Sequence, residues 1–213
     1  MEETKANVGP YLKLYQVHSA TFDSGILTNT AVHEAMHNCR VKNGWKIGLS
    51  VSGPNQDELI KEALKIRVGQ PPKNPVRLFD SVQCTYNILE QRPAEALMEA
   101  HSAGVDIIIK EGLANGRALR HPKLLELAQT LACQPDQLAL GAILSQPFRP
   151  RVLSGAVTAE QLSSNFGALY PTSKGVEEKL KATEGEAVLD TLMKESRMES
   201  ERYWSDRSAL KWN

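Results

Sequence analysis

The chain has 213 residues, which is enough for one large domain or two small ones with a real hydrophobic core. Its 25 lysines and arginines equal its 25 aspartates and glutamates, so no net charge draws it toward nucleic acid or an anionic membrane. Residues 1–10 lack the apolar stretch of a secretory signal, and no apolar run reaches membrane-spanning length. We therefore expect a soluble, cytoplasmic protein with neither a nucleic-acid nor a membrane partner.

Short β-rich runs alternate with longer helical runs along the chain, which is typical of a parallel sheet with crossover helices. The strands are expected, in chain order, at Tyr11–Val17, Trp45–Ser50, Leu78–Gln83, Val105–Ile109 and Arg151–Leu153. The helices are expected at Asn29–Val41, Asn55–Arg67, Pro93–Ala103, Pro122–Ala132, Pro135–Ser145, Thr158–Leu169 and Val176–Arg202. This spacing fits both an open doubly wound sheet and an eight-stranded barrel.

Polar residues follow each expected strand, and these strand ends meet at one rim in parallel α/β proteins. They are His18 with Ser19, Ser50 with Ser52, Gln83, Lys110 with Glu111, and Ser154 with Gly155. One polar residue after a strand means little. A polar residue after all five strands favours a functional site at this rim.

The three cysteines are Cys39, Cys84 and Cys133. They are odd in number, far apart and without metal-ligand spacing, which suits a reducing compartment better than a disulfide framework. We expect three buried thiols.

Five segments follow one another in a characteristic order. They are LYQVHS, GWKIGLSVSG, FDSVQCTYNILEQ, IIIKEGLANGRAL, and QLALGAILSQP with VLSGAVTAEQLSSNFGAL. Over about residues 11–170 they resemble the fourth to eighth strand segments of the aldo-keto reductases. The resemblance implies an α/β fold, a partial (β/α)8 TIM barrel of about five parallel strands. It also implies one truncated domain over residues 1–213, in which 171–213 form a polar C-terminal helix and tail.

The resemblance assigns a nicotinamide dinucleotide, NADP or NAD, to the chain and no metal. Ser50 and Gln83 match groups that hydrogen-bond the nicotinamide carboxamide. Leu113 and Gly116 match a loop whose backbone lies along the pyrophosphate, and Asn165 matches the asparagine that contacts the adenine edge. The implied substrate is a small carbonyl compound or alcohol.

Several positions depart from the family pattern. Val51 stands where a second carboxamide partner is usual, and Lys110 stands where a tyrosine stacks on the nicotinamide. Glu111 puts a carboxylate near the expected path of the phosphates. Gly155 and Gln161 replace a lysine and an arginine associated with the 2′-phosphate, so the choice between NADPH and NADH stays open.

Catalysis is assigned by resemblance to His18, which matches the histidine that orients and polarises the substrate carbonyl. The family's catalytic Asp, Tyr and Lys come from strands before this histidine, but only residues 1–10 precede its strand here. Hydride delivery leaves an alkoxide that needs a proton donor. We therefore expect a truncated gene model, splice product or degenerate copy that is inactive or severely impaired. An N-terminal segment lost by such truncation could have carried an organelle-targeting signal.

The expected five strands would leave two open sheet edges, unlike a closed barrel. Such a chain should aggregate, fold differently, or self-associate through those edges.

A competing motif is HEAMH, formed by His33, Glu34 and His37. Two histidines one helical turn apart with a glutamate between them can bind zinc and activate water, as in zinc peptidases. The third ligand would have to be Glu58 or Glu62. The alternative, which we favour, places both histidines on the solvated flank of a helix whose buried stripe is Val32, Ala35, Met36 and Cys39.

Three functions therefore remain open from the sequence. The first is an oxidoreductase of aldehydes, ketones or sugars. The second is an inactive remnant that keeps some dinucleotide affinity or serves as an interaction surface. The third, remote, is the zinc peptidase.

Overall fold

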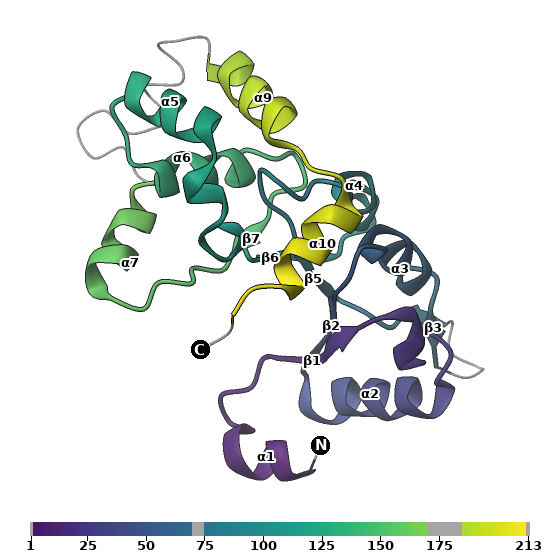
Figure 1. The fold of residues 1–213 in the computed structure, drawn as a ribbon. Coiled ribbons are helices and arrows are strands. Elements are labelled where there is room, and N and C mark those ends of the chain that lie inside the picture. Colours follow the sequence, from purple (N-terminus) through teal and green to yellow (C-terminus); the bar gives the residue numbers. More distant parts are fainter. Residues whose placement is uncertain (1, 70–74, 170–184, 212–213) are drawn as a thin grey trace. The chain divides into compact units, whose positions relative to one another are not determined.

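A computed structural model describes residues 2–69, 75–169 and 185–211 of the chain. Within them, five strands form one sheet in the order β1-β2-β5-β6-β7 (Figure 1). The strands are β1 Leu14–Ala20, β2 Lys46–Val51, β5 Ser81–Thr85, β6 Asp106–Lys110 and β7 Arg151–Val152. The pairs β1–β2, β2–β5 and β6–β7 are parallel. The predicted α/β fold, with five parallel strands as in part of a TIM barrel, is confirmed.

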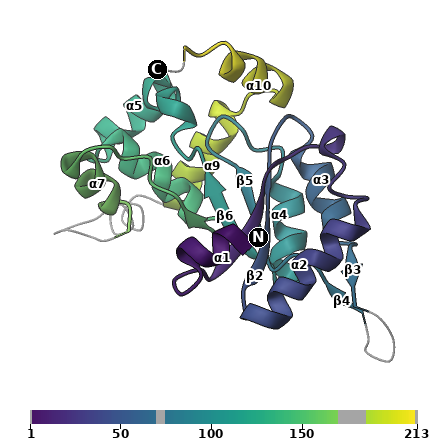
Figure 2. The same cartoon turned by 90° about the horizontal axis from the view of Figure 1, so that it is seen from below.

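Helix α1, Glu2–Val8, precedes the first strand and was not predicted, whereas the other helices lie between and after the strands, as the alternating pattern predicts (Figure 2). These other helices are α2 Thr30–Asn43, α3 Gln56–Ala63, α4 Ala94–Ser102, α5 Pro122–Thr130, α6 Pro135–Leu144, α7 Ala159–Phe166, α9 Gly185–Ser196 and α10 Ser200–Ser208. Short 3-10 turns occur at Phe22–Ser24, Ala114–Gly116 and Ala118–Arg120.

The first predicted strand is shifted along the sequence. The structure starts β1 at Leu14 and continues it to Ala20, whereas Tyr11–Val17 was expected. Tyr11 is 85% exposed, so nothing buries the side chain that suggested an earlier start. The shift places His18 and Ser19 inside the strand rather than beyond it.

The chain divides into two compact units. Unit 1 comprises residues 1–84 with 96–107, and unit 2 comprises residues 85–95 with 108–213. In unit 1, helices α2 and α3 contact β2. The β2 side chains Ile47 and Leu49 are fully buried. Leu59 and Ile60 of α3 are at most 1% exposed. Such apolar strands and one-sided helices explain the core of this unit.

A hairpin in unit 1 corrects the predicted helix Asn55–Arg67. Helix α3 ends at Ala63, and Arg67–Val68 form β3, which pairs antiparallel with β4, Val76–Arg77 (Figure 2). The β-branched Val68 is 2% exposed. Its burial and its pairing with Val76 outweigh the helical pattern at this end of the segment.

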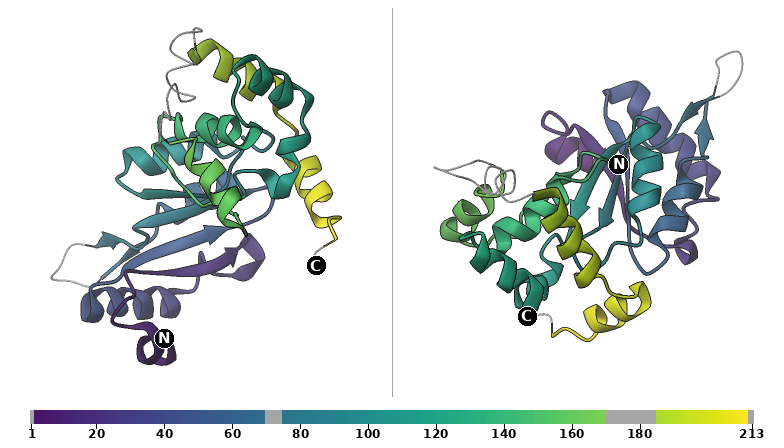
Figure 3. Two further views of the ribbon diagram at one scale, coloured as in Figure 1. Left: turned by 90° about the vertical axis from the view of Figure 1, so that its left-hand side faces the viewer. Right: turned by 90° about the horizontal axis from the view of Figure 1, so that it is seen from above.

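In unit 2, helix α5 packs on α6 and α9, and α6 packs on α7 and β7 (Figure 3). Leu124, Leu138 and Ile143 from these helices are fully buried. Tyr86 and Phe148 add an edge-to-face aromatic pair, with ring centroids 5.3 Å apart. This helical cluster is the core that supports the loops after β6 and β7.

The predicted last helix, Val176–Arg202, is wrong as one continuous element. Residues 176–184 lie outside the described residues. Beyond them, α9 ends at Ser196 and α10 begins at Ser200, with Glu199 in an extended conformation between them. The backbone N–H of Met198 donates to the carbonyl of Leu89, 2.8 Å away, instead of continuing the helix. This tertiary contact interrupts a segment whose local sequence is helical throughout.

The HEAMH helix also differs from expectation. His33 is 5% exposed, and one of its ring nitrogens hydrogen-bonds the carbonyl of Ile26, so the predicted solvated position of His33 is wrong. A backbone partner inside the fold makes burial of an imidazole tolerable. Over the described ranges, no group of three or more His, Cys, Asp or Glu side chains could hold a metal ion.

The three cysteines are thiols and form no disulfide. Cys84 is buried, but Cys39 and Cys133 are partly exposed, so burial was predicted correctly for Cys84 alone. Within the described ranges, no helix has both the length and the apolar character needed to cross a bilayer.

Candidate functional site

The loop after β6 has an unusual backbone. Glu111, Ala114, Asn115 and Gly116 have φ angles of 56°, 51°, 57° and 82°. This left-handed region is unfavourable for residues other than glycine, by about 1–2 kcal/mol each. The loop is held by its own hydrogen bonds, from Ala114 N–H to the Glu111 carbonyl and from Gly116 N–H to the Leu113 carbonyl, at 2.8 and 2.9 Å. Strain of this kind is concentrated at ligand-binding loops.

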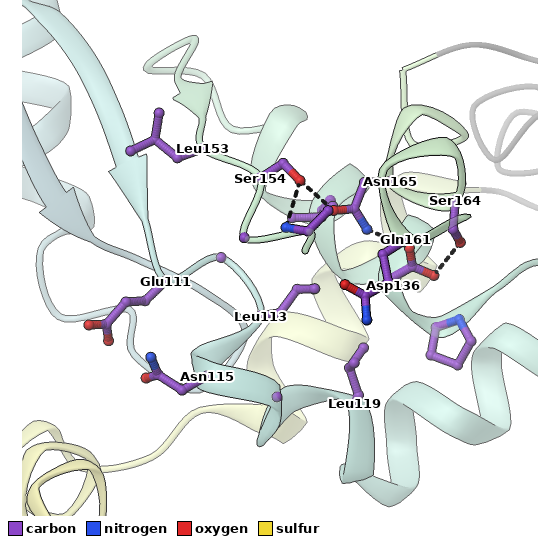
Figure 4. A pocket seen from close by; sticks show the side chains of 16 residues that line it. Glu111, Leu113, Asn115, Leu119, Asp136, Leu153, Ser154, Gln161, Ser164 and Asn165 are labelled. Atoms are coloured by element: carbon purple, nitrogen blue, oxygen red, sulfur yellow. Dashed lines mark hydrogen bonds between the residues drawn. The ribbon is translucent and has the colours of Figure 1, made fainter. Parts of the chain in front are cut away.

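This loop forms one wall of a cavity of about 670 Å³ that lies entirely in unit 2 (Figure 4). The other walls are the start of α6, the segment that follows β7, and α7. The cavity therefore opens beside the carboxyl ends of two neighbouring parallel strands, where TIM-barrel proteins place their sites. Leu113, Gly116 and Asn165, which were predicted separately from two distant segments, all line it.

A hydrogen-bond network joins one side of the cavity. Asp136, at the start of α6, accepts a bond from the Ser164 hydroxyl at 2.9 Å and one from the Asn165 amide at 2.7 Å. The Ser154 hydroxyl donates to the Asn165 side-chain carbonyl at 2.8 Å. Figure 4 shows these four side chains facing one another. The network ties α7, the segment that follows strand β7 and the start of α6 to one another around the cavity.

Helix α7 begins at this network. The hydroxyl of Thr158 accepts a bond from the Gln161 N–H, as its predicted capping role requires. In a capping box the Gln161 side chain would also accept from the Thr158 N–H. Here the Gln161 side-chain carbonyl accepts instead from the Val157 N–H, at 2.9 Å. Gln161 is therefore held at the cavity wall as a neutral group.

Glu111, whose carboxylate was expected near the phosphates, is paired with α10. Arg207 reaches both of its oxygens, with Nε at 2.9 and 3.0 Å. The two side chains are 11% and 28% exposed, and this hydrogen bonding raises the pKa of Arg207 above its usual value. The charge of Glu111 is thus compensated, which sequence reasoning missed. No local signal could reveal a partner 96 residues away.

Tyr203 of α10 links this ion pair to the loop. Its ring is fully buried beneath the Arg117 guanidinium, 4.1 Å from the ring centroid. The Asn87 amide donates to its hydroxyl at 3.0 Å, and the hydroxyl lies 3.3 Å from the Glu111 carboxylate. Burial and the nearby Glu111 charge raise the pKa of Tyr203, so the hydroxyl stays protonated and can donate.

Two of the predicted nicotinamide contacts lie in unit 1. Ser50 and Gln83 are register partners on the neighbouring strands β2 and β5. Ser50 is fully buried, whereas Gln83 is partly exposed and its carbonyl accepts from the Gln16 amide at 3.0 Å. The structure thus brings this pair together. The pair belongs to unit 1, whereas the cavity belongs to unit 2.

His18 is exposed at an irregularity near the end of β1. The β1–β2 register shifts between Val17 and Ala20, and Ser19 has a left-handed φ of 52°. A bulge of this kind re-aims side chains and often occurs beside active sites. In the residues that the structure describes, the imidazole of His18 has one hydrogen-bond partner, the Ser19 hydroxyl, which lies 3.1 Å from Nδ1.

The parallel sheet and the cavity at its strand ends fit an α/β protein that forms part of a TIM barrel. No protein-family model matches the sequence, and no curated protein matches it. The solved structures similar to it include the aldo-keto reductase AKR11C1 from Bacillus halodurans in its holo form, at 25% identity and a TM-score of 0.62 over 90% of this chain and 62% of that one. Over most of its length the chain is therefore similar in fold to the aldo-keto reductases.

Two further solved structures share the fold. One is a mutant of Gox0644 in complex with NADPH, at 16% identity and a TM-score of 0.64, covering 99% of this chain and 68% of that one. The other is an aldo/keto reductase from Klebsiella pneumoniae in complex with NADP and acetate, at 19% identity and a TM-score of 0.61, covering 86% and 59%. The present chain thus spans less than two thirds of the length of the Bacillus and Klebsiella proteins.

A buried carboxyl group holds α10 and predicts a pH dependence of stability. Glu90 is fully buried, and its oxygens accept from the Ser200 hydroxyl at 2.6 Å and the Arg92 N–H at 3.1 Å. Burial raises its pKa above 4.5, and these hydrogen bonds offset part of the rise. Between pH 4.5 and the folded pKa the native state binds the extra proton, so stability should fall as the pH rises through this window.

The variant Glu90→Gln keeps the shape of the side chain and removes the titration. Chemical unfolding from pH 4 upward should show a shallower decline for the variant than for the natural chain. Parallel pH profiles would contradict this role of Glu90.

Proposed function

We propose that this chain provides the dinucleotide site of an NAD(P)(H)-dependent oxidoreductase that acts on aldehydes, ketones or sugars. The observation that carries the proposal is that Leu113, Gly116 and Asn165 line one cavity, although they were assigned to a dinucleotide from separate parts of the sequence. The likeness to aldo-keto reductases, among them proteins solved with NADPH or NADP, supports it.

The cavity is suited in size to the adenosine diphosphate half of a dinucleotide, and its apolar and hydrogen-bonding groups suit an adenosine. A volume of about 670 Å³ lies within the usual range of roughly 300–1,000 Å³ for small-molecule sites. Leu113, Leu119 and Leu140 supply apolar lining for a base. Asn165 and Ser154 supply hydrogen-bonding groups, and the strained loop from Glu111 to Gly116 would lie along the diphosphate.

By the same resemblance, Ser50 and Gln83 of unit 1 would contact a nicotinamide carboxamide, and His18 would face the substrate carbonyl. When bound, the dinucleotide supplies the hydride. Ser50 and Gln83 would fix the orientation of the carboxamide. The His18 imidazole would donate a hydrogen bond to the carbonyl oxygen, on which negative charge develops.

The dinucleotide site is tested by replacing Asn165. We expect Asn165→Ala to weaken NADH and NADPH binding about tenfold, which is about 1.4 kcal/mol, because the network loses its central member. Calorimetric titration of the full chain measures this. The matched control is Ser205→Ala on the exposed side of α10, which should bind like the natural chain. Equal affinities for the two variants would contradict the placement.

Turnover separates the oxidoreductase from the inactive remnant. The remnant is favoured by one observation, namely that in the described part of the chain the adjacent Ser19 is the one hydrogen-bond partner of the His18 imidazole, so no second group orients this ring. An active oxidoreductase should consume NADH or NADPH with an aldehyde, and His18→Ala should lower the rate about 10²-fold or more. Dinucleotide binding without any turnover would instead establish the remnant.

A further inference from the structure

The charges around the unit 2 cavity form an unusual set for a site that would hold a polyanion. Of the 16 residues that line it, two are carboxylates, Glu111 and Asp136. None of these lining residues is a lysine, arginine or histidine. The lining therefore offers hydrogen-bonding groups and negative charge, but no cation of its own.

Two arginines near the loop from Glu111 to Gly116 take part in contacts between this loop and α10. Arg117 lies over the Tyr203 ring, and its guanidinium donates to the carbonyls of Ala114 and Tyr203, both at 3.1 Å. Arg207 is bound to both oxygens of Glu111. The positive charge of Arg207 thus neutralises Glu111.

Asp136 is the carboxylate whose charge has no cationic partner among its hydrogen bonds in the described chain. Its two oxygens accept from the neutral Ser164 hydroxyl and Asn165 amide. Since Asn165 is the residue assigned to adenine, Asp136 lies at the adenosine end of the cavity. The neighbouring Ser154, Gly155 and Gln161 are neutral too.

These surroundings discriminate between the two common forms of the cofactor. A ribose 2′-hydroxyl can donate to a carboxylate, because each carboxylate oxygen has capacity for more than one hydrogen bond. A 2′-phosphate carries close to two negative charges, has no donor to offer, and would be repelled by Asp136. Desolvating it without a cation is unfavourable.

Resting on the proposed dinucleotide function, we propose that this cavity selects dinucleotides with a free 2′-hydroxyl, NAD(H), over their 2′-phosphorylated forms, NADP(H). Asp136 is the specificity-determining residue. Its carboxylate would accept a hydrogen bond from the ribose 2′-hydroxyl and would repel a 2′-phosphate. Because Gly155 and Gln161 are neutral, no cation at these two positions would offset that repulsion.

The test is a calorimetric titration of the full chain with NADH, NADPH, ADP-ribose and 2′-phospho-ADP-ribose. The last two probes lack nicotinamide and therefore report on the unit 2 cavity. We expect each unphosphorylated probe to bind at least about tenfold more tightly than its phosphorylated counterpart. Equal or tighter binding of the phosphorylated probes would overturn the selectivity and leave the dinucleotide site intact. Failure of all four probes to bind would overturn both.

Charge variants locate the selectivity in the cavity. Gly155→Lys should shift the NADH to NADPH affinity ratio toward NADPH about tenfold, and a Cβ atom at Gly155 meets nothing within 4 Å, so the side chain has space. Asp136→Asn should shift the ratio in the same direction. The matched control is Gln129→Lys, which adds the same charge at an exposed position of α5 outside the cavity lining. A shift as large for Gln129→Lys as for Gly155→Lys would overturn the assignment.

Discussion

Replacement of Tyr203 by alanine is expected to lower the free energy of unfolding by about 3–5 kcal/mol, as is usual for a fully buried aromatic side chain. The Tyr203 ring is 0% exposed, packs edge-on against Trp204 at 5.8 Å, and lies under the Arg117 guanidinium. Truncation leaves a cavity beside α10 and removes one hydrogen-bond partner of the Asn87 amide, which also donates to the Glu111 carbonyl. Dinucleotide affinity should also fall, since α10 positions the loop from Glu111 to Gly116.

Chemical unfolding of the full chain measures this loss. The variant Tyr203→Phe keeps the ring and removes the hydroxyl, so it should cost only about 1 kcal/mol. Ser205→Ala, on the exposed surface of the same helix, should change stability by less than about 0.5 kcal/mol. A loss below about 1 kcal/mol for Tyr203→Ala would show that α10 does not pack as the structure places it.

The second large effect is expected for Arg207→Ala, which removes the cation from Glu111. Breaking a buried ion pair costs about 3–5 kcal/mol, because the remaining charge is left without compensation. Since Arg207 is 28% exposed, water can reach the site and the lower end, about 3 kcal/mol, is expected. The bare carboxylate would then repel the diphosphate, so dinucleotide affinity should fall at least about tenfold.

A double-mutant cycle isolates this ion pair. Combining Arg207→Ala with Glu111→Gln removes the unpaired charge, so most of the stability and affinity should return. The measurements are unfolding free energies and NADH dissociation constants for the two single variants and the double variant. Additive losses in the double variant would contradict the inferred compensation of Glu111 by Arg207.

Features that depend on neighbours in the chain could be predicted from the sequence. All five strands exist near their expected positions, because buried parallel strands are short apolar runs that end at polar residues. Thr158 caps its helix because the cap needs only a hydroxyl three residues before the N–H it accepts from. The ordered segments likewise identified the aldo-keto reductase fold and the loop and helix that carry Leu113, Gly116 and Asn165.

Features that depend on which distant segments meet were decided by the tertiary structure. Arg207 neutralises Glu111, His33 is buried against the Ile26 carbonyl, and Met198 bonds to Leu89 and interrupts the last helix. Asp136 and Asn165 join across 29 residues to shape the cavity. Burying a polar group costs desolvation free energy, and pairing it with a partner recovers free energy. Whether the net contribution of such a contact to stability is favourable therefore depends on the partner that the fold supplies. Local periodicity thus determined the order of strands and helices, whereas long-range pairing of polar groups decided the charge and shape of the site.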